Sequence, residues 1–350
     1  MRLIIFESIC LAIASATVKR VSVVSQEFIA ASVLPEAHEL TGAELVEYVN
    51  NRQQFFQAEL SPLTSEQHKA RLMHPKYLTK SNFNAAIMTD IDFDDDIPEN
   101  FDARLHWPEC GSIRNIRDQS HCGSCWAVSA AETMSDRACI QSNGTIQIEL
   151  SDTDILSCCG DSCGYGCEGG NPIAAWQYFE LNGVCSGGYY GEMDVCKPYV
   201  FHPCGHHHNE KFYGNCPKNL FPTPTCKPMC QSGYNKTYES DKIYGKSAYR
   251  IPNDETLIQK EIMKNGPVQA AFVVYEDFSH YKSGIYVHTG GKSQGGHAIK
   301  LIGWGVEGGI KYWLVANSWN SDWGEERYVV AMHCDGLAKM VVIAEISGST

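Results

Sequence analysis

The chain has 350 residues, of which 43% are hydrophobic and 20% are charged, and its formal net charge at pH 7 is −13. This composition is that of a globular protein and excludes an intrinsically disordered chain. The negative charge argues against a nucleic-acid-binding protein, because such proteins present a basic surface to the phosphate backbone. The length allows one large domain or two smaller ones around a sizeable hydrophobic core.

The N-terminus predicts a secretory signal peptide over residues 1–16, MRLIIFESICLAIASA. Arg2 precedes an apolar run, and Ala14 and Ala16 supply the small residues of a cleavage site. A buried N-terminal helix is the alternative. The run is too short to span a bilayer and no later segment is apolar enough, so we expect no membrane contact. We expect a protein of the secretory pathway, either secreted or lysosomal.

The cysteines divide the chain into two regions. All sixteen except Cys10 and Cys334 lie in residues 110–230, and residues 17–96 contain none. So many cysteines are typical of a protein that folds in an oxidising compartment. Cys10 would leave with the signal peptide, so an odd number remains and at least one thiol is unpaired.

The region before residue 100 contains one predicted helix and one predicted linker. The helix lies within ELVEYVNNRQQFF and places Leu45, Tyr48, Val49, Arg52 and Phe56 on one face. The acidic stretch DIDFDDDIPEN, residues 90–100, predicts an exposed linker of the kind that proteases cut. We therefore expect a processing boundary near residue 97.

The remaining chain is predicted to have a helix-led half and a strand-led half. A helix is expected from Cys125 to about Gly144, and residues 158–230, rich in glycine, proline and cysteine, are expected to form disulfide-linked loops. Beyond residue 243 the predicted strands are VQAAFVVY, GIYVH, HAIKLIGWG and KYWLVANSW. Asn143 and Asn235 begin N-x-T sequons in turn-like contexts and are candidate glycosylation sites.

Cys122 and Cys125, in DQSHCGSCWAVSAAE, can be interpreted in several ways. A dithiol redox pair would be expected to follow a strand in a βαβ unit, which the pattern lacks. A zinc site would need further ligands, such as the cysteines of 158–167, although an oxidising compartment favours disulfides. A nucleophilic Cys125 at a helix start would need a base and an orienting polar group, and His297 and Asn317 are candidates.

Cys122-Gly123-Ser124-Cys125-Trp126 resembles the C-G-[SA]-C-[WY] signature of the papain family of cysteine proteases. In that family the His and Asn usually lie about 130–150 residues after the catalytic Cys. His297 and Asn317 lie farther than this from Cys125, which indicates an insertion. Residues 195–230 have that character, and HPCGHHHNEKFYGNC within them is similar to the occluding loop of cathepsin B. Further matches to cathepsin B-like enzymes are FDARLHWPEC, IRDQ, SCCGDSCGYGCEGG, YKSGIYVH, GGHAI and YWLVANSWNSDWGE.

The resemblance implies an α+β, papain-like two-domain fold. Its left domain would be helix-rich, its right domain an antiparallel β-barrel-like sheet, and the active-site cleft would lie between them. The implied organisation is a signal peptide (1–16), a propeptide that blocks the cleft until it is cut (17–96), and a mature peptidase domain (97–350) with an occluding loop at 204–216.

The resemblance also implies catalytic and substrate-binding roles. Cys125 would attack the peptide carbonyl as a thiolate, His297 would be its ion-pair partner, Asn317 would orient the imidazole, and Gln119 would donate to the oxyanion. The implied substrate-binding residues are Gly169 and Gly170 for the substrate backbone, Pro172 and Ala298 for the second pocket, Trp319 as a shield of the Asn–His hydrogen bond, His207 for the terminal carboxylate, and His206 as the partner of Asp118. A metal site or a solvated loop remains an alternative for these histidines.

The same resemblance implies six disulfides: Cys110–Cys139, Cys122–Cys167, Cys158–Cys226, Cys159–Cys163, Cys196–Cys230 and Cys204–Cys216. Cys185 and Cys334 are left without an assignment. No cofactor and no metal is implied. The expected partners are protein and peptide substrates, the chain's own propeptide as an inhibitor, and cystatin-type inhibitors.

The implied function is that of a cysteine-type peptidase with endopeptidase and C-terminal dipeptide-releasing activities, digesting protein in an acidic compartment or gut lumen. The tail after DWGE departs from the family, and the acidic pocket residue of cathepsin B would fall at Lys339 or Met340. The alternative is therefore a catalytically weakened homologue that acts as a binding or decoy protein. A thiol oxidoreductase is a third class.

Overall fold

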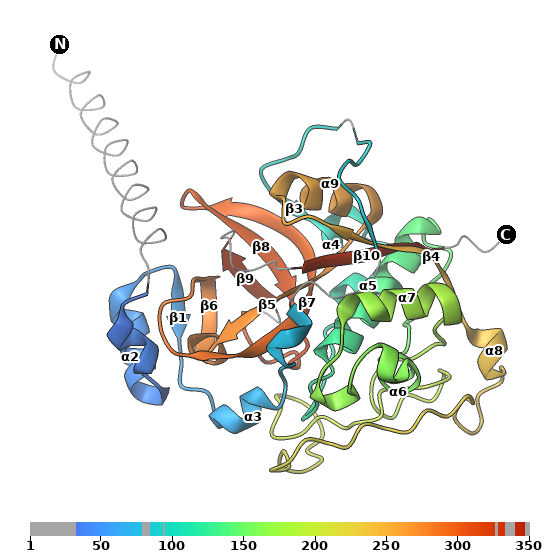
Figure 1. Cartoon of the computed structure of the whole chain (residues 1–350), viewed down its shortest axis with the longest axis horizontal. Coiled ribbons are helices and arrows are strands. Elements are labelled where there is room, and N and C mark those ends of the chain that lie inside the picture. The colour runs from blue at the N-terminus through green and yellow to red at the C-terminus, as the bar shows by residue number, and fades with distance from the viewer. Residues whose placement is uncertain (1–32, 79–84, 94, 326–327, 333–339, 347–350) are drawn as a thin grey trace.

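The computed structural model describes residues 33–78, 85–93, 95–325, 328–332 and 340–346. They form an α+β fold in which a helix-rich half and a strand-rich half lie side by side (Figure 1). The signal peptide expected at 1–16, Cys334 and Lys339 lie outside the described residues. Among the helices of the described residues, none combines the length and hydropathy needed to cross a bilayer.

The strand-rich half is one sheet built around β5 (Val268–Tyr275), β7 (Ser293–Glu307) and β8 (Ile310–Ala316), which pair antiparallel. The described strands follow the open path β1-β6-β9-β8-β7-β5-β10-β4-β2, with β3 paired to β7. The other strands are β1 (Phe56–Ala58), β2 (Ala86–Ile87), β3 (Phe101–Asp102), β4 (Gly245–Ile251), β6 (Tyr281–Tyr286), β9 (Tyr328–Met332) and β10 (Met340–Ile346). The pairs β6–β9 and β2–β4 are parallel. The expected barrel-like antiparallel sheet is therefore open and mostly antiparallel.

The helices lie around this sheet: α5, α6 and α7 form a group at the right of Figure 1, whereas α2 lies at the left beside β1 and α9 lies at the top. The longer ones are α2 (Gly42–Arg52), α5 (Cys125–Gln141), α6 (Asp152–Cys158), α7 (Pro172–Asn182) and α9 (Glu255–Asn265). The short ones are α3 (Ser65–Lys69), α4 (Ala103–His106), α8 (Tyr238–Asp241) and the 3₁₀ turns η1 (Pro35–Glu39), η2 (Pro75–Leu78), η3 (Gly111–Arg114), η4 (Gly160–Ser162), η5 (Gly166–Glu168) and η6 (Glu276–His280).

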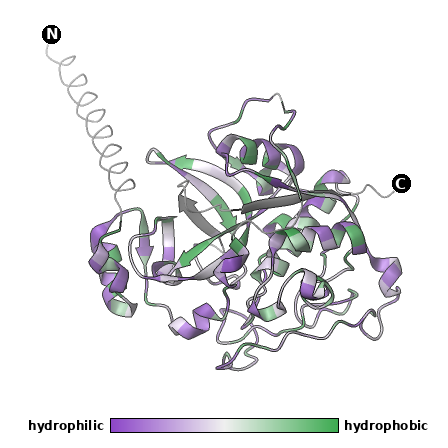
Figure 2. Ribbon diagram, viewed as in Figure 1, coloured by the Kyte–Doolittle hydropathy of each residue, from purple (hydrophilic) through white to green (hydrophobic). Residues whose placement is uncertain are grey.

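The central helix α5 is buried along nearly its whole length. The hydroxyls of Ser129, Thr133 and Ser135 are satisfied inside the helix, because each donates to a backbone carbonyl four residues earlier. The chain leaves the helix through Asn143 and Gly144, which both have positive φ angles of 52° and 77°. Figure 2 shows that β5, like α5 a buried element, is largely hydrophobic.

One predicted helix is shorter than expected. The expected helix around Leu45 exists as α2, but it ends at Arg52, and Phe56 belongs to β1. The side chain of Gln53 explains the change. Its Oε1 accepts from the backbone N–H groups of Phe55 and Phe56, and its Nε2 donates to the carbonyl of Phe56. These bonds turn the chain into the strand.

Residues 158–230 are not all loop, because α7 lies within them. Its start has a recognisable signal, since the side chain of Asn171 caps the helix by accepting from Ile173 N–H and Pro172 occupies the first turn. Gly183, with φ 69°, ends it. The helix is apolar on most sides and carries no amphipathic stripe, which explains why periodicity did not reveal it.

Candidate active site

Cys122 and Cys125 have different chemical states. Cys122 forms a disulfide with Cys167, whereas Cys125 is a free thiol. Cys125 is the first residue of α5, directly after Ser124, and is completely buried. A cysteine at this position lies at the positive end of the helix dipole, which favours a thiolate once the sulfur is exposed.

His297 and Asn317 come together from neighbouring strands. His297 lies on β7, and Asn317 directly follows β8. Nε2 of His297 lies 2.7 Å from Oδ1 of Asn317. The ring of Trp319 lies 4.9 Å from the imidazole, between centroids, and buries this hydrogen bond. Nδ1 of His297 has no hydrogen-bond partner among the described residues.

The strand that carries His297 also reaches the sulfur of Cys125. The backbone of Ala298, the next residue, hydrogen-bonds to the Cys125 thiol, as does the backbone of Met73 from the N-terminal region. The chain places the nucleophile candidate and the base candidate on opposite walls, one on α5 and one on β7. This is the arrangement that a cysteine–imidazole pair requires.

Gln119 links the two halves beside this pair. Its Oε1 accepts a hydrogen bond of 2.8 Å from the hydroxyl of Ser318, and its backbone N–H donates to the carbonyl of Ser318. Its Nε2 donates to the carbonyl oxygens of Cys122 and Arg71, both at 2.8 Å. The side-chain amide of Gln119 is thus fixed in orientation, and one of its two acceptors, the carbonyl of Arg71, comes from the N-terminal region. Sequence reasoning did not identify Ser318.

Burial keeps both candidate groups uncharged in this structure. Desolvation raises the pKa of the Cys125 thiol to about 12, against the smaller opposite effect of backbone hydrogen bonds. Desolvation likewise lowers the pKa of His297 to about 4, although its bond to Asn317 acts in the other direction. Between these two values the thiol is protonated and the imidazole is neutral.

The burial is caused by a segment that precedes residue 97. Met73 exchanges two backbone hydrogen bonds of 2.8 Å with Gly296 on β7, and Leu72 and Met73 are both buried. On the opposite wall Gly169, with φ 114°, approaches Met73 so closely that a Cβ there would lie 2.7 Å from the Met73 Cβ. Residues 71–73 therefore fill the space between the walls.

The remaining residues of the expected substrate site line these walls. Gly170 packs against the indole of Trp126, Pro172 is buried at the start of α7, and Ala298 is buried on β7. The segment around Met73 pairs its backbone with β7 and not with Gly169 or Gly170.

The loop 204–216 lies at one end of the cleft, where a cavity of about 460 Å³ is lined by His206, His207, Arg71, Trp319 and Trp323, among others. The expected pair of His206 with Asp118 is wrong. Nε2 of His207 lies 3.4 Å from Asp118, and its Nδ1 lies 3.0 Å from Asp322.

The two histidines differ because their rings have different neighbours. The ring of His206 stacks on Phe212 with 4.2 Å between centroids, which turns it away from Asp118. Burial alone would lower the pKa of His207, but the hydrogen bond to Asp322 and the charge of Asp118 outweigh it and raise the pKa above its ordinary value of 6.5. His207 therefore holds the loop against the rest of the protein.

The described residues contain six disulfides, which are the six pairs implied by the resemblance: Cys110–Cys139, Cys122–Cys167, Cys158–Cys226, Cys159–Cys163, Cys196–Cys230 and Cys204–Cys216. Cys185, left unassigned, is a buried free thiol. The sequon residues Asn143 and Asn235 are both exposed.

Two further groups near the site carry no sequence signal that we recognised. The hydroxyl of Tyr199 donates to the carbonyl of Gln119 and lies 2.8 Å from the hydroxyl of Ser124. Lys300, on β7 three residues after His297, forms a fully buried ion pair of 2.8 Å with Asp136 on α5. The contacts of Tyr199 hold Gln119 and Ser124 in place, and the ion pair joins the wall that carries α5 to the wall that carries β7.

Comparisons with known proteins agree with this geometry. Residues 97–344 match the family described as papain family cysteine protease. The chain is 50% identical over 303 residues to cathepsin B-like cysteine proteinase 6 of Caenorhabditis elegans, covering 84% of this chain and 79% of that protein. It is also 50% identical over 289 residues to the gut-specific cysteine proteinase of the same organism, covering 83% and 85%.

Among solved structures, procathepsin B S9 from Trypanosoma congolense superposes with a TM-score of 0.74 at 31% identity, covering 88% of this chain and 99% of that one. An unpaired Cys125 opposite His297 and Asn317, in a chain with these relatives, leaves one family assignment. The chain belongs to the papain family of cysteine proteases and is a cathepsin B-like enzyme.

Proposed function

We propose that this peptidase is made as an inactive precursor that becomes both an endopeptidase and a C-terminal dipeptide-releasing enzyme. Residues 17–96 would be the propeptide and residues 97–350 the mature enzyme. The contacts of Leu72 and Met73 with both walls of the cleft support the first part of the proposal. The position of loop 204–216 at the end of the cleft supports the second.

The proposed reaction begins when the propeptide leaves and the Cys125 proton passes to His297. The thiolate attacks the substrate carbonyl, and Gln119 Nε2 and the Cys125 backbone N–H bind the oxygen that becomes negative. The imidazolium of His297 protonates the departing amine, which leaves a thioester on Cys125. A water activated by His297 then releases the acid product, and Asn317 keeps the imidazole oriented throughout.

Dipeptide release would depend on two histidines with roles opposite to those first expected. We assign loop closure to His207, because it is the ring that contacts Asp118 and Asp322. His206 is exposed at the cavity and is therefore our candidate for binding the substrate's terminal carboxylate. A substrate carboxylate held there would place the scissile bond two residues from the chain end.

The pH dependence of this activity follows from the sign of the His207 pKa shift. A raised pKa means that the charged imidazole stabilises the closed loop at acidic pH, and this contribution is lost as the pH rises through the folded-state pKa. Dipeptide release should dominate in acid, and endopeptidase action should gain as the loop opens.

The proposed setting is an acidic compartment or a gut lumen, reached through the secretory pathway. One relative is the gut-specific cysteine proteinase of Caenorhabditis elegans, and two exposed sequons are compatible with glycosylation at Asn143 and Asn235. Cystatin-type proteins are proposed as inhibitors, since the cleft that they would enter is the one filled here by residues 71–73.

The alternative is a catalytically weakened homologue that acts as a decoy. The divergent tail favours it, but the side chain of Met340 and the whole of Lys339 lie outside the described part. Against it stand Gln119, Cys125, His297 and Asn317, which are all present. His297 is hydrogen-bonded to Asn317, and Gln119 to the next residue, Ser318. Activating the precursor at acidic pH and adding an epoxide that alkylates thiolates decides between them. An enzyme loses peptide hydrolysis with label on Cys125, whereas a decoy shows neither.

Dipeptide release is tested with two substrates that differ only in a free or amidated C-terminus. For the activated enzyme, the ratio of dipeptide release to internal cleavage should fall between pH 5 and 7.5. His207→Ala should abolish this change, and His208→Ala is the matched control because only the backbone of His208 contacts Asp322. His206→Ala should lower dipeptide release while leaving internal cleavage intact. A flat ratio in the unmodified enzyme would refute the proposal.

A further inference from the structure

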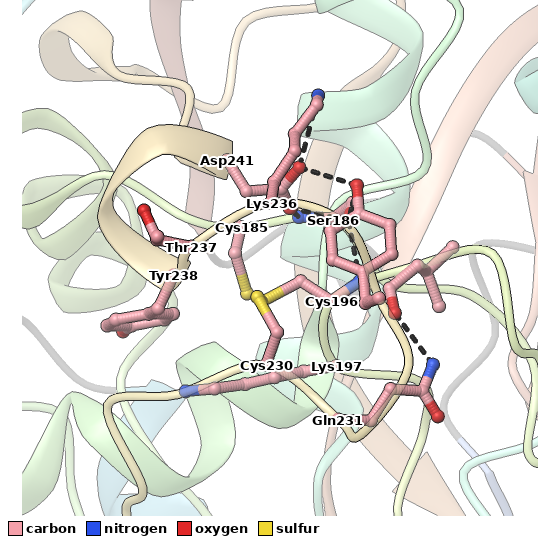
Figure 3. Close-up of a disulfide and its surroundings, with 12 residues drawn as sticks. Cys185, Ser186, Cys196, Lys197, Cys230, Gln231, Lys236, Thr237, Tyr238 and Asp241 are labelled. Atoms are coloured by element: carbon pink, nitrogen blue, oxygen red, sulfur yellow. Dashed lines mark hydrogen bonds and ion pairs between the residues drawn. A yellow bond between two sulfur atoms is a disulfide. The ribbon is translucent and has the colours of Figure 1, made fainter.

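A third sulfur lies beside the disulfide between Cys196 and Cys230, and the peptidase mechanism makes no use of it. Figure 3 shows the Cys185 side chain pointing at this disulfide. The sulfur of Cys185, the sulfur of Cys196 and a carboxylate oxygen of Asp241 lie within 4.8 Å of one another. Cys185 is fully buried and is unpaired.

We propose that Cys185, Cys196 and Cys230 form a thiol–disulfide exchange site. Sγ of Cys185, as a thiolate, attacks Sγ of Cys196, so that the Cys185–Cys196 bond forms and the Cys196–Cys230 bond breaks. The electron pair of the broken bond leaves with the sulfur of Cys230, which takes up the proton that Cys185 lost. One disulfide replaces another, and the step needs no oxidant or reductant.

The backbone already holds the two new partners together. The backbone N–H of Cys196 donates to the hydroxyl of Ser186 at 2.7 Å, and the N–H of Lys197 donates to the carbonyl of Ser186 at 2.9 Å. The segments 185–186 and 196–197 therefore run side by side. A bridge between Cys185 and Cys196 would therefore join neighbouring segments, and a disulfide needs its two Cα atoms close together.

Charged groups around Cys185 restrain the exchange in the resting protein. Burial and then the carboxylate of Asp154 on α6 raise the pKa of the thiol, Lys197 opposes them, and Asp241 on α8 raises it further. Lys197 contacts Asp154 at 2.6 Å, and Lys236 lies 3.3 Å from Asp241. The thiol is protonated at acidic and neutral pH, so the exchange is slow there and quickens as the pH rises.

The exchange would change how the loop 204–216 is tethered. The bridge between Cys196 and Cys230 closes the ends of the segment that contains this loop, and Cys230 at its C-terminal end is half-buried. After exchange the new bridge spans only 185–196, and Cys230 becomes a free thiol in a partly exposed position. The segment between 197 and 229 then keeps its link through Cys226 to Cys158 but loses its link at 230.

The test uses the full-length precursor with Cys125→Ser, so that neither proteolysis nor the reactive thiol interferes. In a Cys230→Ser variant of this chain, the released Cys196 should pair with Cys185. After acid quenching, alkylation under denaturing conditions and digestion, mass spectrometry should find the linked 185–196 peptide in most molecules. Cys139→Ser is the matched control. It releases Cys110 from its disulfide, and since no other cysteine of the described residues is grouped with Cys110, the released thiol should be alkylated.

Two results would overturn the proposal. One is a Cys230→Ser protein with native circular dichroism in which Cys185 and Cys196 are both alkylated. The other comes from an experiment that leaves the disulfide between Cys196 and Cys230 intact. When the Cys125→Ser chain is incubated at pH 8.5 with a maleimide, label should accumulate on Cys230. In the double variant Cys125→Ser/Cys185→Ser, Cys230 should stay unlabelled. An unlabelled Cys230, or equal labelling with and without Cys185, refutes the exchange whatever the enzyme's peptide specificity proves to be.

Discussion

The side-chain amide of Gln119 donates a hydrogen bond of 2.8 Å to the main-chain carbonyl oxygen of Arg71. Arg71 belongs to the segment that fills the cleft and is itself buried. The donor that we assign to the oxyanion is thus engaged by the chain's own N-terminal region. The Arg71 carbonyl satisfies this buried amide, and in the proposed activation the same donor becomes available when the segment departs.

Replacing Gln119 should separate its catalytic role from its structural one. For the activated enzyme, Gln119→Ala should lower kcat/KM about 10²–10³-fold, because one oxyanion donor contributes roughly 3 kcal/mol to the barrier. Steady-state hydrolysis of a fluorogenic peptide measures this loss. Gln147→Ala is the control, since its amide donates to Glu109 and Gly144 and not to the cleft. An unchanged kcat/KM for Gln119→Ala would contradict the assignment.

The reactivity of Cys125 should change on activation. Its pKa of about 12 in the precursor means that the thiolate is scarce at pH 6, and iodoacetamide should react slowly, with a rate that rises tenfold per pH unit. Once the segment around Met73 is removed, exposure and the imidazole of His297 favour the thiolate, and the rate at pH 6 should rise at least about a hundredfold. Cys185 in the same sample serves as the internal control, and equal rates for Cys125 before and after activation would count against the proposal.

The sequence predicted the α+β fold and much of the site. Why a given element could or could not be predicted differs from one element to the next. The helix from Cys125 and the strands β5, β7 and β8 were predictable because their local patterns agree with their tertiary environments. The end of α2 was missed because it depends on the side-chain bonds of Gln53, which no periodicity reports.

The different contacts of His206 and His207 could not be read from the sequence either. The two residues are adjacent and chemically identical, and what distinguishes them is the stacking of one ring on Phe212 and the reach of the other to Asp118. Asp322 is more than a hundred residues away in the chain. Such contacts between distant loops exist only in the folded protein.

Removing one carboxylate from His207 should shift the pH at which the loop opens. In Asp322→Asn the hydrogen bond and charge that raise the His207 pKa are weakened, so the pKa falls and the closed loop is lost at a lower pH. We expect the midpoint of the change in dipeptide-release ratio to fall by about one pH unit. Asp161→Asn, an exposed carboxylate on η4, should leave the midpoint in place. A midpoint that moves upward in Asp322→Asn would contradict the sign of this argument.

The buried ion pair between Asp136 and Lys300 should be costly to break on one side. Asp136→Asn leaves an ammonium without its partner between α5 and β7, and should lower the free energy of unfolding by about 3–5 kcal/mol. Urea denaturation of the disulfide-intact precursor measures this. Lys311→Ala, which removes an exposed pair with Glu255, should cost at most about 1 kcal/mol.

A second substitution separates charge from packing in this pair. Lys300→Met combined with Asp136→Leu removes both charges and should recover most of the lost stability. If the double variant is as unstable as Asp136→Asn alone, the damage comes from altered packing and not from the stranded ammonium.

The disulfide between Cys122 and Cys167, together with the hydrogen bond of 2.8 Å from Gly123 N–H to the carbonyl of Cys167, joins the turn before Cys125 to the turn before Gly169. Both turns belong to the same wall of the cleft. These two links hold Cys125 and Gly169 within one wall, so we expect the proposed departure of residues 71–73 to change how this wall faces the strand of His297 and not its internal arrangement. In the proposed mechanism, the nucleophile and the glycines expected to bind the substrate backbone would then keep one relative arrangement from precursor to enzyme.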